Sequence, residues 1–220
     1  TEGHYILLEE MIRTGRTDIE LLYNTNISNL KYKDKDLLSL WKHFEKDVII
    51  AASVDHVGKR AEYIRHGTKW AEVEENLLKI NEMPNVALQI NTVVSLYNFL
   101  TLDIFYQYLM DKGIYTKDST VFSLYNMNTP RPISALALPD HMKQIGIERL
   151  KNLSVEFDRN KMTSDKVSQL SNAIRWVRSE TIWDNVKTEF WEETKRLDNA
   201  RNENFVEVFP ELAELLNETN

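Results

Sequence analysis

Residues 46–55, KDVIIAASVD, decide the fold of this chain. Five consecutive apolar residues, 48–52, form the centre of this stretch, and an aspartate lies close to each end of the run. A short, uninterrupted apolar run with several β-branched residues is typical of a parallel strand that is buried on both faces. The stretch therefore predicts a central strand of a parallel sheet.

The segments on both sides of this strand alternate between strand and helix patterns. Further strands are expected at 18–26, 85–95 and 119–127. Helical spacing of apolar residues predicts helices over 4–14, 34–45, 69–82 and 101–112. Strands that alternate with helices form parallel sheets through right-handed crossovers. We therefore expect an α/β fold, namely a partial TIM-like parallel β/α barrel with its four strands in sequential order.

The character of the sequence changes after residue 139. Residues 128–139 contain three of the five prolines and are expected to form a loop. Beyond them, we expect helices over 140–158, 164–179 and 181–199, then a short extended segment and a helix within 205–217. The predicted division is a partial barrel at 1–139 and a helical C-terminal region at 140–220.

The composition argues against several classes of protein. The 220 residues carry a net charge of −7 and no block of Lys and Arg, so binding of nucleic acid is not expected. No apolar run of about 18 residues is present, so no membrane span is expected, and the first residues do not resemble a signal peptide. The absence of cysteine excludes disulfides and thiolate metal sites. We expect a cytoplasmic protein, although a cysteine-free chain suits either redox environment.

Polar side chains follow each expected strand, at the end where parallel α/β folds bind ligands. The candidate site residues are Asn26, Ser53, Asp55, Asn91 and Asn98, together with Arg65. Uncharged hydrogen-bonding groups suit a ribose-like ligand, and Arg65 can pair with a carboxylate. At any single position, a helix cap or a turn is the alternative role, and a solvated surface charge is the alternative for Arg65.

Two other patterns have simpler interpretations. Asp55, His56 and His66 could be metal ligands, but no further His or acid lies at ligand spacing. Tryptophans at 176, 183 and 191 are spaced by seven and eight residues, which is typical of helix packing.

Residues 53–77, SVDHVGKRAEYIRHGTKWAEVEENL, resemble the fourth strand and following helix of radical S-adenosylmethionine (radical SAM) enzymes. The family pattern is a Ser-hydrophobic-Asp-Gly turn, an Arg-x-Gly, an aromatic residue and a helix that ends in Asn. The matching residues are Ser53, Asp55, Arg65, Gly67, Trp70 and Asn76, whereas His56 replaces the usual Gly.

The resemblance extends over most of the chain. Asn24-Thr25-Asn26 looks like the end of the family's third strand, and residues 91–98 look like its fifth strand. Residues 197–215, LDNARNENFVEVFPELAEL, resemble the tail of the subgroup with a truncated "twitch" auxiliary region.

The resemblance implies that the candidate site residues contact the ribose, carboxylate and adenine of S-adenosylmethionine. In the family, a four-iron four-sulfur cluster is held by a CxxxCxxC loop, and this chain has neither that loop nor the Gly-Gly-Glu-Pro of the second strand. We therefore expect Thr1 to follow that motif in a longer parent protein. The parent would carry the cluster and act on a small molecule or a peptide, and this chain alone would ligate no cluster and be inactive.

Two alternatives stay open. The chain could be a cluster-free α/β module that binds a nucleoside-like ligand or a protein partner. It could also be an unrelated hydrolase or lyase that uses Asp55 as acid or base.

The missing barrel strands have a consequence for self-association. Residues 18–24 would form an unpaired edge, and residues such as Ile50, Ala52, Leu88 and Ile90 would face a gap. We expect a homodimer or higher oligomer that covers the open barrel edge, or else helices within 164–199 that fold back over it.

Overall fold

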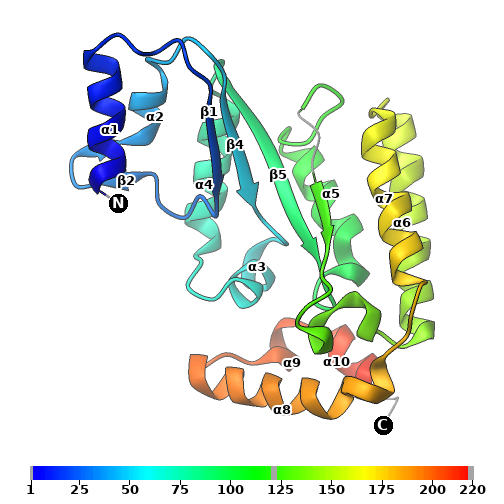
Figure 1. Cartoon of the computed structure of the whole chain (residues 1–220). Helices are drawn as coiled ribbons and strands as arrows, with labels where there is room; N and C mark the ends of the chain where they lie inside the picture. The colour runs from blue at the N-terminus through cyan, green and yellow to red at the C-terminus, as the bar shows by residue number, and fades with distance from the viewer. Residues whose placement is uncertain (1, 120–122, 218–220) are drawn as a thin grey trace.

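A four-stranded parallel sheet forms the centre of the molecule (Figure 1). The computed structural model describes residues 2–119 and 123–217. The strands are β1 (Leu21–Thr25), β4 (Val48–Ser53), β5 (Val86–Val94) and β6 (Ser123–Asn126). They are all parallel and are ordered β1-β4-β5-β6, which confirms the α/β class and the sequential strand order. Part of the predicted fourth strand, residues 120–122, lies outside the described residues.

One face of the sheet is covered by crossover helices. Ile50 pairs with Leu88 and Ala52 pairs with Ile90, and all four side chains are buried. The helices that follow β4 and β5 are α4 (Trp70–Asn81) and α5 (Leu102–Asp111), and both turn buried apolar residues inwards. The expectation that these four residues face a gap is therefore wrong. An uninterrupted apolar run does not reveal which alternate residues face the helices.

The opposite face of the sheet is open. Leu22 on β1 and Tyr125 on β6 are 64% and 54% exposed. Between them, Ile49, Gln89 and Val93 on this face are only partly buried. Among the described residues, Figure 1 shows no helix in front of this face.

The chain around β1 forms a small helical and hairpin layer. Helix α1 (Glu2–Arg13) buries Tyr5 and Leu8. The two-residue strands β2 (Lys31–Tyr32) and β3 (Lys35–Asp36) form an antiparallel hairpin that the sequence did not predict, because this segment has no apolar alternation. Helix α2 (Leu37–Trp41) follows, and the Asp36 side chain caps it by accepting a hydrogen bond from the Leu38 N–H.

A short helix that the sequence pattern missed connects β4 with α4. Helix α3 (Gly58–Ile64) has only seven residues, which is too short for a clear helical period. It begins at Gly58, whose φ of 59° lies in the left-handed region that glycine adopts without strain.

The C-terminal helices lie against β6 and beyond the carboxyl ends of the strands (Figure 1). They are α6 (Asp140–Arg159), α7 (Ser164–Val177), α8 (Trp183–Arg201), α9 (Phe205–Val208) and α10 (Pro210–Asn217), preceded by short 3₁₀ turns at Phe99–Thr101, Arg131–Ile133 and Ala135–Ala137. Helix α7 packs against β6, where the Leu124 N–H donates to the Gln169 side chain. This is the sheet edge opposite β1, so the expectation that helices within 164–199 fold back over β1 is wrong.

The two predicted regions share one hydrophobic core. Buried residues from α1 through α10 belong to a single cluster. The segment predicted to be extended, from residue 205, is instead the short helix α9, which Asn204 caps by accepting from the N–H groups of Val206 and Glu207. No described helix is long and apolar enough to cross a membrane.

Candidate functional site

The candidate site lies at the carboxyl ends of β4 and β5. Ser53 is the last residue of β4 and is aligned with Asn91 on β5. Aligned residues of parallel strands point to the same face, so both side chains lie on the open face of the sheet. Both are partly exposed, and neither side chain makes a hydrogen bond within the described part of the chain. Their hydroxyl and carboxamide groups are therefore free to bind a ligand.

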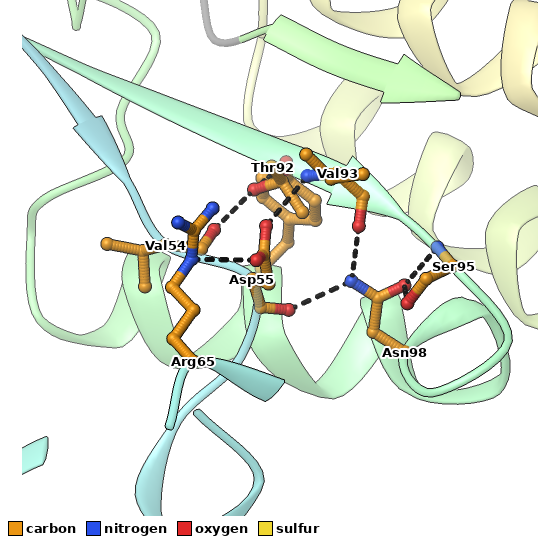
Figure 2. Close-up of polar contacts among 8 residues, drawn as sticks. Val54, Asp55, Arg65, Thr92, Val93, Ser95 and Asn98 are labelled. Atoms are coloured by element: carbon orange, nitrogen blue, oxygen red, sulfur yellow. Dashed lines mark hydrogen bonds and ion pairs between the residues drawn. The ribbon is translucent and has the colours of Figure 1, made fainter. Parts of the chain in front are cut away.

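Asp55 lies two residues beyond β4 and is only 4% exposed. Its Oδ1 accepts from the Val93 N–H at 2.7 Å, and its Oδ2 accepts from Arg65 Nε at 2.8 Å (Figure 2). Burial raises the pKa of Asp55, and the adjacent Arg65 guanidinium opposes this effect. Both carboxylate oxygens have donors within the fold, so the Asp55 carboxylate is held in place and in turn orients Arg65.

Arg65 is the charged group that this arrangement presents to solvent. The side chain is 31% exposed and is placed by the end of α3, where its backbone N–H donates to the Ala61 carbonyl. Only Nε is used by Asp55, and the two terminal nitrogens make no hydrogen bond to the described residues (Figure 2). A guanidinium fixed at one nitrogen and free at two others can bind a carboxylate bidentately.

Asn98 has a different role from the one that its position suggested. It is fully buried, and its Nδ2 donates to the carbonyls of Asp55 (3.1 Å) and Val93 (2.9 Å). Its Oδ1 accepts from the Ser95 N–H at 2.8 Å. All of these bonds stay within the fold, so Asn98 ties the ends of β4 and β5 together.

Asn26 also makes a local contact. It is exposed and follows β1, whose last residue Thr25 is aligned with Ala52. Its Oδ1 accepts from the Ser28 hydroxyl at 2.9 Å and the Ser28 N–H at 3.3 Å, which closes a turn. The structure thus pairs Asp55 with Arg65 and aligns Ser53 with Asn91 near the carboxyl ends of β4 and β5, with Asn26 at the adjacent strand end.

A second polar cluster, formed by His56, Arg60 and Thr101, lies next to the site, and the sequence did not predict these contacts. The buried His56 accepts the Val57 N–H at Nδ1, so Nε2 carries the proton and donates to Thr101 Oγ1 at 3.0 Å. Arg60 donates to the same hydroxyl at 3.2 Å. The partner of His56 is 45 residues away in sequence, so no local pattern could have indicated it.

The residues do not fit an iron–sulfur cluster. The sequence has no cysteine, and the described residues include no group of three or more His, Cys, Asp or Glu side chains arranged for a metal ion. The metal interpretation of Asp55, His56 and His66 therefore has no geometric support.

Comparison with known proteins gives no assignment: no family model, no curated protein and no solved structure matches this chain.

Proposed function

We propose that this chain is the C-terminal portion of a radical SAM enzyme and that its sheet forms part of an incomplete β/α barrel. In this proposal, the carboxyl edge of β4 and β5 carries contact positions for S-adenosylmethionine. The parent protein acts on a small molecule or a peptide, and this chain supplies no cluster ligand.

One observation carries the proposal: the Arg65 guanidinium has a free edge at the same end of the sheet where Ser53 and Asn91 carry uncharged polar groups. The Asp55 carboxylate holds Arg65 through Nε alone, at 2.8 Å. Ser53 and Asn91 are aligned on the open face of the sheet. An amino-acid carboxylate matches the two free nitrogens of Arg65, and ribose hydroxyls match the hydroxyl and carboxamide groups.

The sheet supports the same proposal at a larger scale. Four sequentially ordered parallel strands with helices on one face are the arrangement of half a β/α barrel. The open face is where the interior of such a barrel would lie. The C-terminal tail that resembles the twitch subgroup packs beyond the carboxyl ends of the strands and contacts α3.

The chemistry assigned to this chain is binding and orientation. Arg65 pairs with the carboxylate of the ligand, and Ser53 and Asn91 position its ribose. Since the chain has no thiolate, it contributes no reductive step. We expect weak binding of S-adenosylmethionine, because the methionine end has one charged anchor in this chain. A submicromolar affinity would contradict this expectation, because it would show that this chain alone supplies most of the binding free energy.

The test is a pair of NMR titrations with S-adenosylmethionine and with 5′-methylthioadenosine, which lacks the amino-acid end. Wild-type protein should bind S-adenosylmethionine more tightly, and the Arg65→Ala variant should lose about tenfold of that affinity without change for methylthioadenosine. The control is Arg13→Ala, which removes an exposed arginine–glutamate pair on α1. Equal affinity of wild type and R65A for S-adenosylmethionine would contradict the proposal.

The absence of cysteine favours a second candidate, a cluster-free module that binds a nucleoside-like ligand or a protein partner. The same titrations distinguish it from the first. A nucleoside-binding module would bind methylthioadenosine and S-adenosylmethionine equally well, and R65A would affect neither. A CxxxCxxC motif upstream of Thr1 in the native gene would decide for the radical SAM enzyme.

A further inference from the structure

Helix α3 and the residues after it are attached to the C-terminal segment by three polar contacts. Arg60 Nη2 donates to Glu211 Oε1 at 2.6 Å, Tyr63 OH donates to Asp198 Oδ1 at 2.8 Å, and His66 Nδ1 lies 2.7 Å from Glu203 Oε1. We call these three contacts the C-terminal clasp. They join residues that are between 135 and 151 positions apart in sequence.

The Tyr63–Asp198 hydrogen bond is the most buried part of the clasp. Tyr63 is 4% exposed, and its ring packs edge-on against Phe209 with centroids 5.3 Å apart. The other oxygen of Asp198 accepts from the Phe205 N–H at 2.8 Å. One carboxylate therefore holds both Tyr63 and the start of α9. Hydrogen bonds to a carboxylate in apolar surroundings are strong and well oriented.

Arg65 lies two residues after Tyr63, directly after the end of α3, and connects this helix to the candidate site. Its backbone is held by the end of α3, because its N–H donates to the Ala61 carbonyl at 3.0 Å. Its side chain reaches Asp55 from that position. The orientation of α3 therefore sets where the free edge of the guanidinium lies.

We propose that the C-terminal segment 198–211 positions Arg65 through the clasp, and that Tyr63 and Asp198 are positioning residues for carboxylate binding. The segment contacts α3 through the clasp, and the Arg65 side chain reaches from the end of α3 to Asp55 in the site. What Arg65 binds rests on the proposed function above. The coupling between the clasp and the Arg65–Asp55 pair does not.

The first experiment measures the coupling without any ligand. In ¹⁵N-labelled protein, the Arg65 Nε–H should exchange slowly with water, because it donates to the buried Asp55. Tyr63→Phe and Asp198→Asn should each speed this exchange by about fivefold or more. Tyr108→Phe is the matched control, since it removes a tyrosine–glutamate hydrogen bond on α5 outside the clasp. Unchanged Arg65 exchange in Y63F and D198N would overturn the inference, whatever their melting temperatures.

The second experiment adds the two ligands. Y63F should weaken binding of S-adenosylmethionine by about fivefold and leave binding of methylthioadenosine unchanged, because only the former has a carboxylate. General loosening of the fold would weaken both and would count against a positioning role. If wild-type protein binds neither ligand, the proposed function fails while the exchange measurement still decides the coupling. If wild type prefers S-adenosylmethionine and Y63F keeps the full preference, the positioning role fails alone.

Discussion

Gly146 on α6 is a residue whose missing side chain lets two elements meet. An added Cβ would lie 2.4 Å from Cε1 of the buried Phe99 ring, which follows β5. We expect Gly146→Ala to destabilise the fold by about 1–3 kcal/mol, although helix propensity alone favours alanine by about 1 kcal/mol. Gly3→Ala on α1 is the control, because nothing lies within 4 Å of its added Cβ. Urea unfolding should give opposite signs for the two variants, and stabilisation by both would mean that the Phe99 ring can move aside.

His56 makes stability depend on pH. Burial, with a further contribution from the nearby Arg60 guanidinium, lowers the pKa of His56 from 6.5 to about 4. The unfolded chain takes up the proton below about pH 6.5 and the folded chain only below about pH 4, so this contribution to stability is complete above pH 6.5 and is lost between these values. The expected loss is about 3 kcal/mol of the free energy of unfolding.

The measurement is urea unfolding at several pH values between 4 and 7. His56→Gln should lower stability at pH 7 and flatten the dependence in this window. Replacing the exposed His43 with Gln should leave the slope as in wild type. An unchanged slope in H56Q would assign the pH dependence to other groups.

At the scale of elements, a buried lysine attaches α7 to the segment before β6. Lys166 is fully buried, and its Nζ donates to the carbonyls of Thr116 (2.5 Å) and Ser119 (2.8 Å) and lies 4.8 Å from the centre of the Tyr115 ring. We expect Lys166→Met to cost about 2–4 kcal/mol, because buried carbonyls lose their donor. The exposed Lys161→Met is the control and should change the midpoint of thermal unfolding little. Equal midpoints for both variants would show that water replaces the ammonium.

The sequence predicted elements well where one periodicity was long and clear. The apolar run at 48–52 indicated β4, and helical spacing indicated α4 and α6. It could not show which face of β4 is covered, because a fully apolar strand carries no alternation. Nor could it show that Asn91, within β5, stays partly exposed whereas Asn98, four residues after the strand, is fully buried, because burial depends on distant parts of the chain. The Tyr63–Asp198 contact joins residues 135 positions apart and has no local signal.

For the whole molecule, the unprotected surface is the β1 edge together with the open face. Strand β1 pairs with β4 only, among the described residues, and Leu22 on it is 64% exposed. We expect a homodimer that covers this edge, and sedimentation at micromolar concentration should give twice the mass of 25.9 kDa. Leu22→Lys should give a monomer, whereas Val206→Lys, at an exposed position of α9, should stay dimeric. A wild-type monomer would refute this expectation.

The order of strands in the sheet also has a consequence for how the chain reaches its structure. Each strand of this sheet pairs with the strand of the same sheet that was made before it, so the sheet can grow in the order of synthesis, with one crossover segment to close at each step. The clasp differs from the sheet, because its contacts join residues far apart in the chain. Tyr63 can bond to Asp198, and Arg60 to Glu211, only after the C-terminal segment has been synthesised. We therefore expect the docking of helices α8, α9 and α10 to be the last step of folding. The candidate site would then acquire its final geometry only when the last helices of the chain have docked.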